Sequence, residues 1–195
     1  MSGGARWAAT IGGVALALLV APGPAAARLR WSGCGDVEAE CARVRVPLDR
    51  SGAVKGSVGL RVGRYGEPSR KPPLLYLSGG PGAAGVREFA DVLFEVEPLA
   101  RRYQLFSYDQ RGTGSSGLIR CRSLERDPRL RSTRAGEACA ASLGASRGLY
   151  RTQDSVEDVE ALRQALGAEK LTLYRSQLRR EGARYEPLAS FPLSH

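Results

Sequence analysis

The residues best suited to chemistry in this chain form a glycine-rich turn after a short apolar run. Residues 74–77 read Leu-Leu-Tyr-Leu, and they are followed by Ser78, Gly79, Gly80, Pro81 and Gly82. Glycines let backbone N–H groups come close to a ligand, because no side chain stands in the way. Amides that converge just past a strand end can stabilise negative charge that develops on oxygen. The turn is therefore a candidate oxyanion site, although the same residues also fit a tight surface turn.

A second glycine-rich loop follows another apolar run, residues 103–108. It consists of Asp109, Gln110, Arg111, Gly112, Thr113, Gly114, Ser115 and Ser116. The two serines lack a histidine partner, since the one histidine of the chain is the last residue, His195. We therefore do not expect either serine to act as a nucleophile. With one histidine and no Cys-x-x-Cys pair, the sequence also predicts no metal site, and no other cofactor is expected.

Short strands and helices must position the two loops. Residues 42–47 and 58–62 alternate apolar and polar side chains, which predicts two strands that pair antiparallel. Apolar residues at helical spacing predict a helix over residues 89–96. A strand, a helix and a second strand in this order indicate a parallel sheet with right-handed crossovers. Buried strands are expected at residues 74–77, 103–108 and 170–174.

A further helix is predicted from Thr152 onward. Ser155 and Asp158 resemble a capping box, in which two side chains hydrogen-bond backbone groups at the helix start. Gly167 is expected to end the helix, because glycine readily adopts the left-handed conformation found there. Residues 118–150, which come before this helix, are polar and rich in arginine and show no clear element. The apolar face of the helix would consist of Val156, Val159, Leu162 and Leu166.

The 195 residues allow one domain or at most two, and 43% of them are apolar, enough for a core. Residues 1–27 have the composition of a secretory signal peptide, with a positive charge at Arg6, an apolar stretch over 8–21 and three alanines at 25–27. This stretch is too short for a comfortable membrane span. We therefore expect a secreted protein with no membrane span after cleavage, and an uncleaved anchor is the alternative.

Four cysteines follow the predicted cleavage point, which favours disulfides formed in an oxidising compartment. Of the three conceivable pairings we favour Cys34 with Cys41 and Cys121 with Cys139, because each pair lies within one irregular segment. The net charge of +9 comes mostly from arginine. Because the arginines are scattered, with no basic stripe and no interleaved aromatic residues, nucleic acid is not an expected partner.

Together, the two glycine-rich loops resemble those of α/β-hydrolases of the proline iminopeptidase group. More narrowly, the chain is similar to the secreted tripeptidyl-aminopeptidase-like serine peptidases of actinobacterial type over residues 31–174. Most members carry histidine where Ser78 stands here, but serine matches the secreted subgroup. Either motif alone would be weak, whereas both at this separation are fairly specific. Further matches lie at Cys34 with residues 40–42, and at residues 46–49, 150–152, 158–163 and 166–167.

This resemblance implies a truncated α/β-hydrolase fold, in which an N-terminal antiparallel hairpin precedes the start of a parallel sheet with crossover helices. It assigns part of the oxyanion hole to the amides around Gly79 and Gly80. It also implies a serine aminopeptidase that acts on a peptide or a small acyl substrate. Asp109 would not be the triad acid, which lies far downstream in this family. The loop that shapes the site wall and packs under the glycine turn would consist of Asp109, Gln110, Arg111 and Gly112.

The nucleophile elbow of this family, Gly-x-Ser-x-Gly, is due directly after the strand at 171–174. Here Arg175 and Arg179 occupy the glycine positions and Gln177 stands in place of the serine, so no catalytic residue is intact. The codons CGG AGT CAG CTA CGG CGA GAA GGN are allowed for residues 175–182, and a shift of one nucleotide makes them encode Gly-Val-Ser-Tyr-Gly-Glu-Lys. We therefore expect a frameshifted tail on an inactive fragment, and a genuinely divergent tail is the alternative.

The sequence thus divides into a signal peptide (1–27), the N-terminal half of an α/β-hydrolase domain (28–174) and a divergent tail (175–195). Three other interpretations stay open. The first is a non-catalytic binding module or pseudoenzyme built on half of the fold. The second is a fragment of an esterase-type α/β-hydrolase, because selectivity in this fold lies mostly in loops and caps inserted after the central strands. The third is a small disulfide-bonded extracellular domain unrelated to hydrolases.

Overall fold

The computed structural model describes residues 29–35, 37–80, 82–126 and 133–175. The predicted signal peptide, the tail after Arg175 and the expected nucleophile position at Gln177 lie outside these residues. All four cysteines and, apart from Pro81, both glycine-rich loops lie within them.

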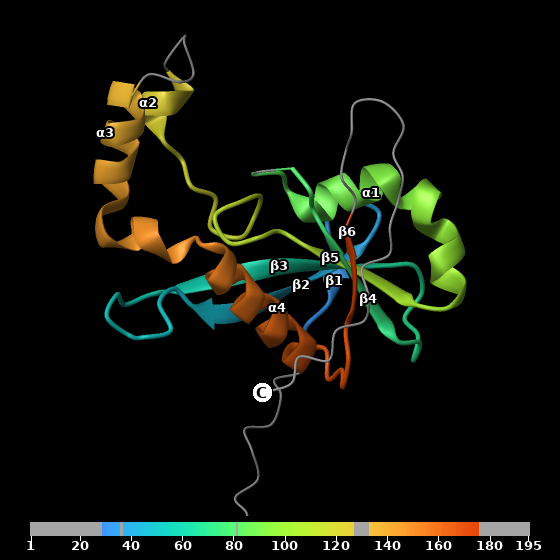
Figure 1. The fold of residues 1–195 in the computed structure, drawn as a ribbon. Helices are drawn as coiled ribbons and strands as arrows, with labels where there is room; N and C mark the ends of the chain where they lie inside the picture. The colour runs from blue at the N-terminus through green and yellow to red at the C-terminus, as the bar shows by residue number, and fades with distance from the viewer. Residues whose placement is uncertain (1–28, 36, 81, 127–132, 176–195) are drawn as a thin grey trace, which may run out of the picture.

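The described residues form one mixed sheet of six strands in the order β1-β2-β3-β5-β4-β6 (Figure 1). The first three strands pair antiparallel, and β3 also pairs antiparallel with β5. By contrast, β4 runs parallel to both of its neighbours, β5 and β6. This arrangement confirms the predicted hairpin followed by the start of a parallel sheet. The strands are β1 (Ser32–Gly33), β2 (Glu40–Pro47), β3 (Ser57–Tyr65), β4 (Pro73–Leu77), β5 (Gln104–Tyr108) and β6 (Thr172–Arg175).

Helices cover both faces of the sheet (Figure 1). The first, α1, packs with Leu74 and Tyr76 of β4, whereas α4 belongs to the core that contains Leu75. Successive side chains of a strand point to opposite faces, so an unbroken apolar run such as β4 is buried on both sides. The helices are α1 (Gly85–Val96), α2 (Arg122–Glu125), α3 (Thr133–Leu143) and α4 (Thr152–Ala165), with short 3₁₀ helices η1 (Glu97–Arg101) and η2 (Gly144–Leu149).

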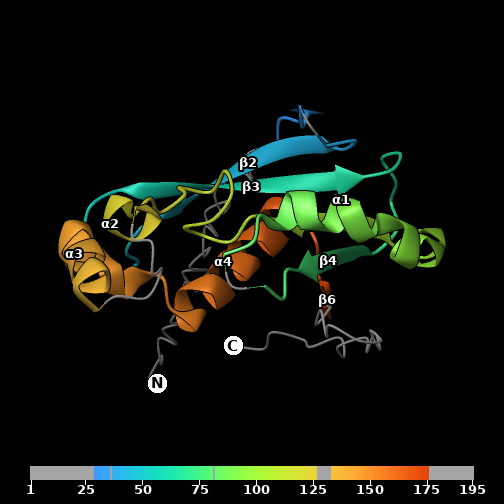
Figure 2. The same cartoon turned by 90° about the horizontal axis from the view of Figure 1, so that it is seen from above.

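The helices α2 and α3 form an arm that packs mainly on itself and stands away from α1 (Figure 2). They lie within residues 118–150, where the sequence shows no clear element. Their weak signal has a physical reason. The first has only four residues, and Ala135 is the one buried residue of the second, so neither carries the apolar stripe by which a helix is recognised.

Both disulfides join the cysteines that the sequence analysis pairs. The Cα atoms of Cys34 and Cys41 are 4.9 Å apart, and those of Cys121 and Cys139 are 5.2 Å apart. The expectation that each pair lies in an irregular segment is wrong. Cys41 belongs to β2 and Cys139 to α3, so each bridge ties a regular element to a neighbouring segment.

The predicted capping box of α4 is wrong by about one helical turn. Arg151 is the N-cap residue, and the backbone N–H of Arg151 donates a hydrogen bond to the carboxylate of Asp154 at 3.0 Å. Ser155 and Asp158 lie farther along the helix, where Asp158 is fully buried. Sequence spacing alone does not tell which of two nearby acids reaches back to the helix start.

The other end of α4 follows the prediction. Gly167 has a φ of 65° and its N–H donates to the carbonyl of Gln164 at 3.0 Å. The N–H of Ala168 donates to the carbonyl of Arg163 at 3.1 Å, which completes a Schellman motif. On the predicted apolar face, Val156 is the exception, because 45% of its surface is exposed.

Candidate active site

The carboxyl ends of β4, β5 and β6 lie at one edge of the sheet, because the three strands are parallel. Leu77, the last residue of β4, pairs with Arg175, the last described residue of β6. The glycine-rich turn therefore leaves the sheet beside the point where the chain leaves β6. Ligands of open α/β sheets bind outside such strand ends.

The glycine-rich turn presents backbone donors to solvent. Gly79 is exposed, and Gly80 is half-buried. Within the described part of the chain, neither Gly79 nor Gly80 donates a hydrogen bond from its N–H. The carbonyl of Gly80 accepts from the N–H of Ala83 at 3.2 Å, which closes the turn. Two unpaired amides at a strand end can stabilise an oxyanion.

Glu88 of α1 hydrogen-bonds the first residue of the glycine-rich turn and the strand before it. Its carboxylate accepts the hydroxyl of Ser78 at 2.5 Å through one oxygen and the hydroxyl of Tyr76 at 2.7 Å through the other. The first residue of the turn and the preceding strand are thereby tied to the same helix. Nothing in the sequence singled out Glu88, since a half-buried acid on an amphipathic helix resembles any other polar residue of its outer face.

Asp109 joins the two glycine-rich loops. Its side chain is fully buried, and its carboxylate accepts the N–H of Val86 at 3.0 Å and the N–H of Ser115 at 2.8 Å. The N-cap residue of α1, Ala84, provides no side-chain cap. Asp109 supplies the missing acceptor from the end of β5, and its negative charge suits a helix N-terminus. One carboxylate therefore fixes both the helix after the first loop and the middle of the second loop.

Glycines allow this close contact between the loops. A Cβ added at Gly114, whose φ is +47°, would lie 2.3 Å from a carboxylate oxygen of Asp109 and 3.0 Å from the Cβ of Ala84. A Cβ added at Gly85 would lie 2.2 Å from the backbone oxygen of Tyr108. Neither contact is sterically possible, so only glycine fits at these two positions.

Two more buried side chains fix the start of α1. The hydroxyl of Ser107 donates to the carbonyl of Gly85 at 2.7 Å, and the hydroxyl of Tyr65 donates to the carbonyl of Val86. Burial raises the pKa of the Tyr65 hydroxyl, and the nearby charge of Asp109 raises it further, so Tyr65 stays a protonated donor. Sequence reasoning missed both: Ser107 lies within the apolar run of β5, and Tyr65 lies beyond residue 62, where the predicted strand ends, although β3 continues to Tyr65.

The other residues assigned to the site wall make contacts of their own. Arg111 is buried against Asp158 of α4, with Nε–Oδ2 and Nη2–Oδ1 distances of 2.7 and 2.6 Å. Burial alone would lower the pKa of Arg111, but the hydrogen bonds and charge of Asp158 raise it, so the guanidinium stays charged. Gln110 is half-buried. At Gly112, φ is +81°, and an added Cβ would lie 2.9 Å from the side chain of Ile119.

No serine among the described residues is paired with a histidine. Ser116 is buried, and its hydroxyl accepts the backbone N–H of Arg61 at 2.8 Å. Ser115 is exposed, and the described ranges contain no histidine. They also contain no cluster of residues that could hold a metal ion and no helix that is long and apolar enough to span a membrane. The contacts described above hold the two glycine-rich loops in place.

Comparison with known proteins agrees with this fold. A family model described as the alpha/beta hydrolase fold matches residues 72–174. A tripeptidyl aminopeptidase of Streptomyces coelicolor is 27% identical over 185 residues, which cover 80% of this chain and 34% of that protein. A tripeptidyl aminopeptidase of Streptomyces lividans matches with the same identity and coverage. The chain therefore spans about a third of the length of the curated relatives it matches.

Among solved structures, an alpha/beta hydrolase from Novosphingobium aromaticivorans aligns with a TM-score of 0.41 and 18% identity, over 70% of this chain and 35% of that one. The family match spans β4, α1, β5, α4 and most of β6, the elements that carry both glycine-rich loops. The chain belongs to the α/β-hydrolase fold family.

Proposed function

We propose that this chain carries one wall of the active site of a secreted serine aminopeptidase, which releases residues or short peptides from free N-termini. The amides of Gly79 and Gly80 would provide half of its oxyanion hole. The observation that carries the proposal is that these two N–H groups, unpaired among the described residues, stand at the strand end beside β6. The tripeptidyl aminopeptidases named above support the peptidase class.

The attacking serine would belong to an elbow that follows β6, where Gln177 now stands. In this fold the nucleophile lies on the sharp turn after that strand, and its backbone N–H completes the oxyanion hole. The loss of any family-like pattern directly after Tyr174 supports a reading-frame change at that point. The polypeptide with residues 175–195 as printed would then be inactive, since it lacks the nucleophile, the acid and a paired histidine.

The division of the chain belongs to the same proposal. Residues 1–27 would be removed as a signal peptide, residues 28–174 would form the hydrolase part, and residues 175–195 would be the altered tail. Two disulfides in the folded part suit secretion into an oxidising compartment. N-terminal sequencing of the secreted protein would be expected to begin at Arg28.

A fluorophosphonate probe tests the activity without assuming a substrate, because it labels activated serines. We expect no labelling of the 195-residue chain, and no release of chromophore from a tripeptide with a free N-terminus. A gene corrected by one nucleotide after codon 174 and extended in that frame should yield a labelled protein. Its elbow Ser→Ala variant is the matched control and should stay unlabelled.

Three results would contradict the proposal at different points. Labelling of the uncorrected chain would show that its nucleophile lies elsewhere. Nucleotides across codons 174–182 that cannot encode an elbow would end the frameshift hypothesis. A corrected enzyme that cleaves an N-acetylated tripeptide or a simple acyl ester better than the free tripeptide would be an endopeptidase or an esterase.

A further inference from the structure

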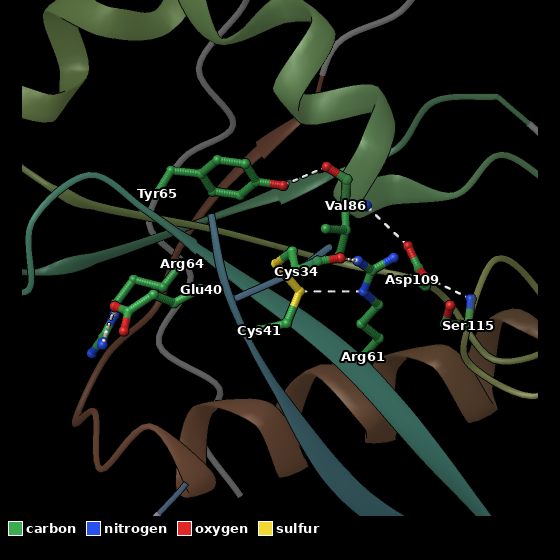
Figure 3. Close-up of a disulfide and its surroundings, with 9 residues drawn as sticks. All are labelled: Cys34, Glu40, Cys41, Arg61, Arg64, Tyr65, Val86, Asp109 and Ser115. Carbon is green, nitrogen blue, oxygen red and sulfur yellow. Dashed lines mark hydrogen bonds and ion pairs between the residues drawn. A yellow bond between two sulfur atoms is a disulfide. The ribbon is translucent and has the colours of Figure 1, made fainter. Parts of the chain in front are cut away.

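Arg61 of β3 lies where the N-terminal disulfide meets the second glycine-rich loop. Its backbone faces that loop, since its carbonyl accepts the N–H of Asp109 at 2.9 Å and its N–H donates to the hydroxyl of Ser116 at 2.8 Å. Its side chain reaches the disulfide, donating to the carbonyl of Cys34 at 2.6 Å and to the sulfur of Cys41 at 3.2 Å. Figure 3 shows the guanidinium pointing from β3 to the disulfide.

From these contacts we propose that Arg61 is a positioning residue for Asp109, and that the Cys34–Cys41 disulfide is the brace that holds Arg61. The N-terminal disulfide would then help to set the wall that carries the oxyanion turn. The role of this wall in catalysis rests on the proposed function. The coupling between the disulfide and the wall is independent of that function.

The chain of contacts is short and consists of buried or half-buried groups. The disulfide closes residues 34–41, where the N–H of Cys34 donates to the carbonyl of Ala39 at 3.0 Å and the N–H of Ala39 donates to that of Val37 at 2.8 Å. Glu40 and Cys41, at the end of this segment, pair with β1 and β3. With the bridge intact, the Cys34 carbonyl and the Cys41 sulfur stay at fixed positions. A guanidinium presents its donors in a rigid fork, so two fixed acceptors also fix the orientation of Arg61.

The backbone of Arg61 carries this orientation to the second glycine-rich loop. Its carbonyl accepts the N–H of Asp109, and its N–H donates to the hydroxyl of Ser116. Without the bonds between its side chain and the disulfide segment, this stretch of β3 would be fixed less firmly beside the loop. The carboxylate of Asp109 would then hold the N–H groups of Val86 and Ser115 less firmly.

The second disulfide provides a matched control. Cys121–Cys139 has a sequence separation of 18, against 7 for Cys34–Cys41. It joins the N-cap residue of α2 to α3, and these helices pack mainly on each other. Its loss should loosen the arm and leave Asp109 in place. A general effect of losing any disulfide would instead appear in both variants.

Hydrogen exchange read by mass spectrometry on the folded chain tests the coupling without substrate. In the C34S/C41S variant, peptides that cover residues 84–88 and 109–116 should exchange about tenfold faster, as expected for the loss of one or two hydrogen bonds. Peptides from α4 should keep their rates. Arg61→Met, with both disulfides intact, should give the same regional pattern, and C121S/C139S should change only peptides from α2 and α3.

Unchanged exchange at residues 84–88 and 109–116 in Arg61→Met would overturn the inference, as would equal acceleration in α4. Should C34S/C41S fail to fold, Arg61→Met alone decides between these results. Failure of the hydrolase proposal would look different, because a chain with no elbow in any frame could still show the exchange pattern. A frame-corrected enzyme that the fluorophosphonate probe labels, but that lacks this exchange pattern, would exclude only the role of the Cys34–Cys41 disulfide as a brace.

Discussion

The buried ion pair between Arg111 and Asp158 should be among the most sensitive points of the fold. Their side chains are 1% and 0% exposed, and they meet through two hydrogen bonds. Asp158→Asn removes the charge and leaves the guanidinium buried. Breaking a buried pair by removing one partner costs about 3–5 kcal/mol. Arg111 would keep its bonds to the carbonyls of Leu48 and Leu149, at 3.0 and 2.8 Å, so we expect a loss of about 3 kcal/mol.

Urea unfolding followed by far-UV circular dichroism measures this loss. With a slope of about 2 kcal/mol per molar urea, the midpoint of Asp158→Asn should fall by about 1.5 M. A double-mutant cycle with Arg111→Met should give a coupling free energy of about 2 kcal/mol, because either single variant loses the contact between the two side chains. In Arg111→Met the carboxylate of Asp158 keeps its hydrogen bond from Arg50 at 2.7 Å. Glu160→Gln is the control on the same helix. Its pair with Arg163 is partly exposed, at 20% and 24%, and should contribute less than about 1 kcal/mol.

The ion pair also explains how the second loop is held, because it ties Arg111 to the helix that covers the opposite face of the sheet. A midpoint shift in Asp158→Asn no larger than that in Glu160→Gln would refute this role. So would a coupling free energy near zero, which would mean that the two side chains act independently.

Three further predictions concern the loops and α4. In thermal melts, Gly85→Ala should destabilise the fold by more than about 2 kcal/mol, because the added Cβ would lie 2.2 Å from a backbone oxygen. Gly80→Ala is the control and should be nearly neutral, because the atom nearest to its added Cβ would be 3.6 Å away. Tyr65→Phe should cost about 1 kcal/mol in the same assay, because the buried hydrogen bond from its hydroxyl to the carbonyl of Val86 is lost. An unchanged melting temperature would contradict a contribution from that bond. Burial alone would raise the pKa of Asp154, but hydrogen bonds from Arg151 lower that pKa below its ordinary value of 3.8. The contribution of Asp154 to the free energy of unfolding should therefore persist from neutral pH down to about 4 and be lost as the pH falls below 3.8. An Asp154→Asn variant that unfolds at the same acid midpoint as the unchanged chain would exclude this.

Local patterns in the sequence were sufficient to predict the frame of the fold. An unbroken apolar run followed by glycines predicts β4 and its turn, because a strand covered on both faces needs no alternation. Alternation at residues 42–47 and 58–62 predicts the β2–β3 hairpin for the opposite reason. The succession of strand, helix and strand predicts the parallel part of the sheet, and the parallel pairing of β4 with β5 and β6 confirms it.

The interactions that hold the site together could not be predicted in this way. Asp109 binds the N–H of Val86, 23 residues earlier, and Arg111 binds Asp158, 47 residues later. Such partners are chosen by the packing of the folded chain and leave no periodic trace. Asp154 and Asp158 illustrate the limit, since both are acids near a helix start and only the fold assigns one to the cap and the other to the core.

The central claim is that one carboxylate, that of Asp109, fastens both glycine-rich loops into a single wall. Amide hydrogen exchange at Val86 and Ser115, followed by NMR in Asp109→Ala, tests it most directly. Alanine removes both acceptor oxygens at once. Both amides should exchange at least about tenfold faster, while the amides of α4 keep their rates. Native exchange at either Val86 or Ser115 would contradict the claim, because the two loops would then be held independently.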